Sequence, residues 1–277
     1  MKHLRYILIA LALLSATPVF AAAREFSTLN LATTSSISSY WKEDGNGNDE
    51  TGLRNLTDSS ITYGVGKFGT SSIYSGSARQ YSSVMPTGTV GSLSVWTTST
   101  ESGQLGAIIS RSKETNPYSR VAIPFNYIYA GSVSFGWSGG TLNTYPAAGN
   151  YADGGWHNVI ITMTSSGVRM KIDGVLQSLS FLTGNSTTRF WWDDVGNDHF
   201  QLGSDSYDGN NLRQPFIGRL DDVVIFQQPL NDWEENCIAV ATDTLCYEPP
   251  PVPEPATTVS GYFSYIKKII SFIKNLV

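Results

Sequence analysis

The stretch WHNVIITMTSSGVRMKIDG, residues 156–174, indicates the fold most clearly. Apolar and polar residues alternate in its first eight positions and again from Val168 to Ile172, which is typical of strands that bury one face. Small residues separate the two runs, and Asp173-Gly174 suits a tight turn that needs a positive φ. We therefore predict an antiparallel hairpin here, followed by a strand through Val175 and Leu176.

Similar alternating runs occur on both sides of this hairpin, and turn residues separate them. They cover residues 92–97, 107–110, 121–125, 132–137 and 220–226. No amphipathic helix of useful length is expected before residue 258. The pattern predicts an all-β protein in which two antiparallel sheets pack face to face around a shared core.

The first 23 residues have the features of a secretory signal peptide. Lys2 and Arg5 precede an apolar run at residues 6–14, and small residues permit cleavage after Ala21 or Ala23. The run is shorter than the roughly 18 residues that a membrane-spanning helix needs. We expect an exported protein, secreted or held at the cell surface, with its folded domain at residues 24–247.

The last 30 residues differ in composition from this domain. Residues 248–258 contain the sequence EPPPVPEP, which predicts an extended and fairly stiff linker. Within residues 259–277, apolar side chains recur at helical spacing from Tyr262, and Lys267, Lys268 and Lys274 occupy the opposite face. The pattern predicts a cationic amphipathic helix on a proline-rich tether, and residues 262–277 suit a membrane surface or a partner protein.

Charge and cysteine content limit the possible partners and the compartment. The chain has 18 basic and 23 acidic residues, but the signal peptide and the C-terminal helix hold five of the basic ones. The region between them therefore carries a net charge near −10, which disfavours nucleic acid and is compatible with divalent cations. In an exported chain, Cys237 and Cys246 are expected to form a disulfide.

Three separated stretches resemble one known family. Tyr40-Trp41 leads into an Asp/Asn/Gly-rich loop at residues 43–52, and residues 155–175 contain the Trp-His strand followed by Asp-Gly. The third stretch is GRLDDVVIF at residues 218–226, with Trp233-Glu234 after it. In this order, across about residues 38–240, they resemble LamG-like domains of the laminin G/concanavalin A-like lectin and glucanase type. The resemblance implies a two-sheet antiparallel jelly-roll sandwich.

The resemblance leaves several functions open, because the family includes glycan-binding, adhesion and purely structural domains. Glycoside hydrolases share the sandwich, and their two carboxyl groups lie on one strand as Glu-x-Asp-x-x-Glu. No glutamate of this chain begins that pattern. We therefore expect a non-catalytic protein, although a carboxyl pair contributed by distant strands would not be visible in the sequence.

A calcium site is a further hypothesis. Asp44, Asn46 and Asn48 alternate oxygen-bearing side chains with glycines, as suits Ca²⁺ and its six to eight oxygen ligands. In the family, structural Ca²⁺ commonly joins an N-terminal loop to the last strand, which would bring Asp222 or its neighbour Asp221 close. The alternative is a solvated loop in which these side chains satisfy its own backbone. His157, within the Trp-His strand, is expected to have a structural role.

For glycan binding, the sequence suggests an exposed aromatic side chain beside polar groups. Trp191 and Trp192 are adjacent, so they cannot both face one core from a strand. Polar residues in the same segment and in the loop 204–211 could add hydrogen bonds. The full predicted set is Trp191, Trp192, Asp194, Asn197, Tyr207 and Asn210. The alternative is that either tryptophan closes the end of the sandwich.

The sequence analysis thus favours a secreted carbohydrate-binding or adhesion module. Its ligand would be a glycan or another cell-surface molecule. The main alternative is a structural surface or assembly protein, which should present an apolar or self-complementary patch.

Overall fold

The structure, a computed structural model, describes residues 25–29, 31, 36–84, 88, 90–113, 116–125, 131–137, 143–146, 149–187, 199–206, 212–240 and 246. The chain divides into two units, residues 1–246 and 247–277. The second unit, with the predicted linker and cationic helix, lies outside the described residues, as does the predicted signal peptide.

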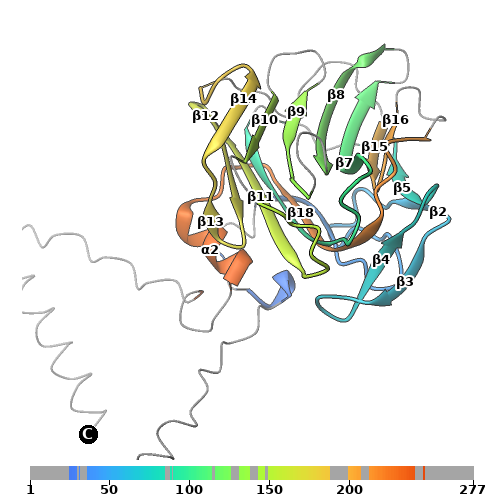
Figure 1. The fold of residues 1–277 in the computed structure, drawn as a ribbon. Coiled ribbons are helices and arrows are strands. Elements are labelled where there is room, and N and C mark those ends of the chain that lie inside the picture. Colours follow the sequence, from blue (N-terminus) through green and yellow to red (C-terminus); the bar gives the residue numbers. More distant parts are fainter. Residues whose placement is uncertain are drawn as a thin grey trace, which may run out of the picture. The chain divides into compact units, whose positions relative to one another are not determined.

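Two antiparallel sheets form the body of the first unit, and Figure 1 shows them as two layers. Sheet A has the order β13 (Val175–Leu176), β12 (Gly167–Ile172), β11 (His157–Thr164), β6 (Gly91–Thr98), β18 (Gly218–Phe226), β4 (Thr70–Tyr74) and β3 (Thr62–Val65), and β1 (Ile37–Trp41) also pairs with β18. Sheet B has the order β14 (Leu179–Thr183), β10 (Asn143–Pro146), β9 (Phe135–Trp137), β8 (Asn116–Phe125), β7 (Gly106–Lys113), β15 (His199–Leu202), β5 (Arg79–Ser82) and β2 (Thr57–Ser59). A separate two-stranded ribbon joins β16 (Asp205–Ser206) to β17 (Leu212–Arg213).

The hairpin predicted from residues 156–174 is confirmed as β11 and β12, paired from Val159 with Ile172 to Thr164 with Gly167. Its alternation has the expected cause. Val159 and Ile161 lie in the core between the sheets, whereas Ile160 belongs to a second apolar cluster on the outer face of sheet A. The predicted all-β, two-sheet sandwich is confirmed.

The core joins the two sheets directly. Trp41, at the end of β1 in sheet A, stacks on Phe200 of β15 in sheet B, with ring centroids 5.1 Å apart. Both side chains are fully buried. An aromatic pair of this size contributes a large buried apolar area and holds the sheets in one relative position.

The sequence analysis did not single out one short helix before residue 258. Helix α2 spans Asp232–Val240. The Asn231 side chain accepts the backbone N–H groups of Trp233 and Glu234, and the Glu234 carboxylate accepts the N–H of Asn231. This reciprocal capping stabilises a helix too short to show a clear amphipathic pattern. Within the described ranges, no helix is long and apolar enough to cross a membrane.

Candidate functional site

The outer face of sheet A is covered by other parts of the chain. An apolar cluster there combines sheet residues such as Val224 and Phe226 with Phe26 of the 3-10 helix η1 (Phe26–Thr28) and Ile238 of α2. All four side chains are buried. This part of the face is therefore closed to a large ligand.

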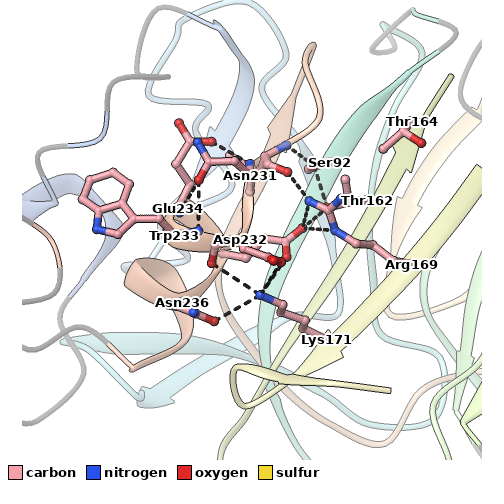
Figure 2. A network of polar contacts seen from close by, with 12 residues as sticks. Ser92, Thr162, Thr164, Arg169, Lys171, Asn231, Asp232, Trp233, Glu234 and Asn236 are labelled. Atoms are coloured by element: carbon pink, nitrogen blue, oxygen red, sulfur yellow. Dashed lines mark hydrogen bonds and ion pairs between the residues drawn. The ribbon is translucent and has the colours of Figure 1, made fainter. Parts of the chain in front are cut away.

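A polar network also holds α2 on this face (Figure 2). Glu235 is buried, and its carboxylate accepts a hydrogen bond from the Thr162 hydroxyl at 2.6 Å and pairs with Arg169 Nη2 at 2.7 Å. Lys171 pairs with the same carboxylate at 3.1 Å and with Asp232 at 3.0 Å. Buried charges need such partners, so this network fixes the position of the helix.

Sheet B differs, because small and polar residues form a row on its outer face. Tyr81 pairs with Gln201, and Gln201 pairs with Ser110. Phe200 and Leu202, on either side of Gln201, lie in the core, so alternation directs Gln201 outward. The register continues the row to positions 122 and 136, which are Ala and Gly. The middle of the row therefore has no bulky residue type.

Hydrogen bonds orient the amide of Gln201. The Ser110 hydroxyl donates to the carbonyl of Ser204 at 2.8 Å, and the Ser204 hydroxyl donates to Gln201 Oε1 at 2.7 Å. Gln201 is only 1% exposed, yet within the described part of the chain its Nε2 donor has no hydrogen-bond partner. Buried amides are nearly always paired in folded proteins, so this donor is suited to an added acceptor such as a ligand oxygen or water.

Ser134 provides a second group of this kind. Its neighbours Val133 and Phe135 lie in the core, so its hydroxyl points away from the core at the start of β9. The Ser134 hydroxyl is buried and, among the described residues, has no hydrogen-bond partner. The outer side of sheet B thus has two unsatisfied polar groups, one on β15 and one immediately before β9.

Tyr81 adds an aromatic ring beside Gln201. The guanidinium of Arg79 lies over this ring, 4.9 Å from its centroid, and both side chains are partly exposed. A half-exposed aromatic next to amide and hydroxyl groups is a typical element of a sugar-binding surface. The sequence analysis missed Tyr81 and Gln201. The alternation in Arg79-Gln80-Tyr81-Ser82 was the signal for the tyrosine, but alternation does not show which of the two faces lies against the core.

The six predicted glycan-binding residues, Trp191, Trp192, Asp194, Asn197, Tyr207 and Asn210, lie outside the described residues. The connectivity nevertheless relates their segments to sheet B. Residues 188–198 lead directly into β15, which carries Gln201, and residues 207–211 connect β16 to β17. The assignment of these residues to a ligand site stays a prediction.

A group of acidic side chains lies between the loop after β1 and strand β18. Glu43 is fully buried, and its Oε2 accepts a hydrogen bond from Gln80 Nε2 at 2.8 Å. The same Nε2 donates to Asp58 at 3.0 Å. Among the described residues, Oε1 of Glu43 has no hydrogen-bond partner. Burial, and then the nearby charges of Asp58 and Asp221, raise the pKa of Glu43 to about 8.

A bulge in β18 places the neighbouring side chains of Asp221 and Asp222 in different surroundings. The register shifts between Asp221 and Val224, and Asp222 has a φ of 46°. Asp221 accepts the backbone N–H of Phe68 at 2.9 Å, and burial raises its pKa to about 8. Asp222 instead accepts the hydroxyl of Tyr40 and the N–H of Phe26, and burial raises its pKa to about 7.

The four predicted calcium ligands do not share one set of contacts. Asp44 accepts the backbone N–H of Thr70 at 2.7 Å, and Asn46 accepts the N–H of Asn48 at 2.9 Å, while Asp222 has the separate partners described above. Asp44, Asn46 and Asn48 are exposed. Across the described ranges, no three His, Cys, Asp or Glu side chains form a group that could hold a metal ion. The loop contacts correspond to the solvated-turn alternative.

His157 lies between two carboxylates. Its Nδ1 is 2.7 Å from Asp173 and its Nε2 is 3.0 Å from Asp153. Asp173 has a φ of 52° and also accepts the N–H of Asn158 at 2.8 Å. The hydrogen bond to Asp173 is the main cause of a raised His157 pKa. His157 therefore holds the Asp-Gly turn after β12, in agreement with the expected structural role.

The two cysteines lie close together as thiols. Cys237 is buried in α2, and Cys246 packs against the same apolar cluster. Burial, with a hydrogen bond to Cys246, raises the pKa of Cys237. Their proximity is compatible with the disulfide, which stays a prediction.

One protein-family model matches this chain. The family model described as the Concanavalin A-like lectin/glucanases superfamily matches residues 69–234. The chain belongs to this superfamily. A search of curated proteins found no match.

Two solved structures have a fold similar to that of this chain. Domain 4 of AbnA, an extracellular arabinanase from Geobacillus stearothermophilus, in complex with arabinotriose, has a TM-score of 0.54 and 16% identity, covering 73% of this chain and 98% of that one. The binding domain of Paraclostridial Mosquitocidal Protein 1 also has a TM-score of 0.54, with 11% identity over 74% of this chain and 52% of that one. At these identities, the similarity concerns the fold alone.

Proposed function

We propose that this protein is a secreted, non-catalytic carbohydrate-binding module and that its glycan site is the outer face of sheet B. One observation carries the proposal: the outer face of sheet A is covered by η1 and α2, whereas the outer face of sheet B presents the partly exposed ring of Tyr81 directly beside the unsatisfied amide donor of Gln201. A sugar hydroxyl is a suitable acceptor for that donor, because a buried amide gains most from a partner that replaces water.

The neighbouring groups have complementary roles in this proposal. Tyr81 offers an aromatic ring on which the C–H face of a sugar ring stacks, and Arg79 limits the ring's motion by lying over its other side. Ser110 and Ser204 fix the direction of the Gln201 amide. Trp191 and Trp192 would add stacking surface, and Asp194, Asn197, Tyr207 and Asn210 further contacts.

The arabinotriose bound to domain 4 of AbnA supports a carbohydrate ligand in the same fold. The buried carboxyl groups support a non-catalytic role. Glycoside hydrolysis needs two carboxyl groups that both reach the scissile bond. Glu43 approaches Asp58 and Asp221 closely enough for their charges to raise its pKa, but it is fully buried. It is therefore poorly placed to reach a polymeric substrate.

Calcium remains part of the proposal, with a ligand set that differs from the predicted one. Glu43 has an unsatisfied Oε1, and the charge of Asp221 lies close enough to raise its pKa. Because no three carboxylates gather among the described residues, we expect a bound Ca²⁺ to involve Glu43 and otherwise backbone carbonyl groups and water, which Ca²⁺ accepts as ligands. Its role would be to neutralise buried negative charge. Calorimetric titration of the chelated protein with Ca²⁺ tests this, and no binding at millimolar Ca²⁺ would contradict it.

Export and surface attachment complete the proposal. Residues 1–23 support secretion, and the lysines of residues 262–277 support attachment to an anionic membrane surface or a partner protein. Co-sedimentation of the full chain with anionic and neutral vesicles separates these two partners. Loss of anionic binding in a Lys267→Glu/Lys268→Glu variant would support the membrane surface.

The main experiment is a glycan-array screen of the full chain with and without chelator. We expect binding that is lost in a Tyr81→Ala/Gln201→Ala variant and retained in Gln177→Ala, a matched glutamine on the linker between β13 and β14. A Trp191→Ala/Trp192→Ala variant tests the predicted tryptophans. Binding that survives the sheet B substitutions would contradict the site, and the absence of glycan binding in every condition would contradict the function.

A further inference from the structure

Strands β13 and β14 are consecutive in the sequence, and each is the edge strand of one of the two sheets. β13 is the last strand of sheet A and β14 is the last strand of sheet B in the described strand order, and only Gln177 and Ser178 separate them. β14 pairs with β10 on one side. Within the described part of the chain, it has no strand neighbour on the other. Its second edge is thus a row of backbone groups suited to another strand.

The edge formed by β13 and β14 carries exposed apolar side chains. Val175 is 63% exposed, Leu176 60% and Leu182 51%. They are among the few large hydrophobic side chains at the surface of the described residues. Exposed aliphatic groups on an edge strand favour pairing with another chain.

The edge also lacks charge. Residues 175–187 contain no Asp, Glu, Lys or Arg, although the folded region carries a net charge near −10. Charged side chains are the usual protection of an edge strand against association. Their absence from an edge that is exposed or partly exposed throughout is therefore a specific feature of this side of the sandwich.

The opposite edges of both sheets are protected. In sheet A, the Arg219 guanidinium donates to the carbonyl of Val65 on β3 at 2.7 Å, which places a charge on that edge. In sheet B, the last strand β2 carries Asp58. The lack of charge is therefore specific to the β13–β14 edge and is not shared by the β3 and β2 edges.

We propose that the β13–β14 edge is a self-association surface, on which β14 pairs antiparallel with β14 of a second copy. A strand supplies the backbone partners that β14 needs, whereas a lipid surface does not. A second copy presents the same uncharged edge, so two strongly acidic bodies meet where no like charges oppose each other. An isologous two-fold contact of this kind closes as a dimer.

The pairing would extend sheet B across both copies. In an antiparallel pair related by a two-fold axis, the two outer faces lie on the same side of the continuous sheet. Two ligand-binding faces would then act on one surface, which raises avidity without any new contact. The dimer itself does not depend on glycan binding.

The test is the molar mass of the full chain in solution, measured by light scattering and sedimentation between about 1 and 100 μM, the range of a moderate dimer affinity. We expect a dimer. Leu182→Lys should raise its dissociation constant by at least about 100-fold, because each copy would bury an unpaired lysine at the contact. The matched control is Val65→Lys, at a side chain that is 78% exposed on the protected edge β3, and it should remain dimeric.

Complementation distinguishes this contact from a general loss of stability. Leu182→Lys and Leu182→Glu should each be monomeric, and an equimolar mixture should form a heterodimer, since the two-fold contact brings opposite charges together. A monomeric parent chain, or a dimer that Leu182→Lys leaves intact, would overturn the proposal. So would a dimer that only Ile269→Lys dissociates, because the association would then belong to the C-terminal segment.

Discussion

Removal of Glu235 should destabilise the protein more than removal of any other single charge in the α2 network. The Glu235 side chain is 1% exposed and pairs with Lys171, which is 5% exposed, and with Arg169, which is 31% exposed. Glu235→Ala leaves the buried Lys171 ammonium without this partner and removes the carboxylate that accepts from the Thr162 hydroxyl at 2.6 Å. Breaking a buried ion pair from one side costs about 3–5 kcal/mol.

Two features of the network place the expected loss near the lower end of that range. Asp232 continues to pair with Lys171 at 3.0 Å, and the Arg169 side chain reaches solvent. We therefore expect a loss of about 3 kcal/mol in the free energy of unfolding. Asp232→Ala is the internal comparison, because this side chain is 81% exposed and its pair with the same lysine should contribute less than about 1 kcal/mol.

The assay is urea unfolding followed by tryptophan fluorescence, with linear extrapolation to zero denaturant. A Glu235→Ala/Lys171→Met double variant should recover part of the loss, because it removes the unpaired ammonium that causes it. Equal effects of Glu235→Ala and Asp232→Ala would refute the argument. So would a double variant that is less stable than Glu235→Ala alone.

Three further predictions concern titratable groups. Glu43→Gln should stabilise the chelated protein by roughly 4 kcal/mol at pH 8, because the folded pKa of Glu43, about 8, exceeds the usual 4.5. The parent protein therefore loses stability as pH rises from 4.5 to 8, and urea unfolding at pH 4 and pH 8 should show a difference between the two proteins only at the higher pH. The pKa of His157 is raised in the folded protein, so its contribution to folding stability is complete below pH 6.5 and is lost as pH rises through the folded pKa. The melting temperature of His157→Gln should therefore lie further below that of the parent at pH 5.5 than at pH 9. Glutathione disulfide should modify Cys246 in a Cys237→Ser variant but leave Cys237 unmodified in folded Cys246→Ser, because only Cys246 is partly exposed. Equal modification of both variants in mass spectrometry would contradict this order of reactivity.

Local patterns were sufficient to predict the strands. The alternation in β11 and β12, the Asp-Gly turn and the run that became β18 all depend on residues near one another in the chain. Such patterns follow from the two-residue repeat of a strand and the φ that a turn requires. Helix α2 was missed because its stability depends on capping by Asn231 and on burial against sheet A, neither of which makes a long periodic pattern.

The sequence by itself therefore determined the all-β class, the strand alternation and the family resemblance, since each depends on residues that are close together in the chain. Only the tertiary structure decided which elements cover the outer face of sheet A, why Gln201 and Tyr81 lie together, and why Glu43 rather than Asn46 is buried among carboxyl groups. These features depend on contacts between strands far apart in the chain. Period-two alternation says that a residue leaves the core, but the packing of distant elements decides whether it then meets a helix, solvent or a ligand.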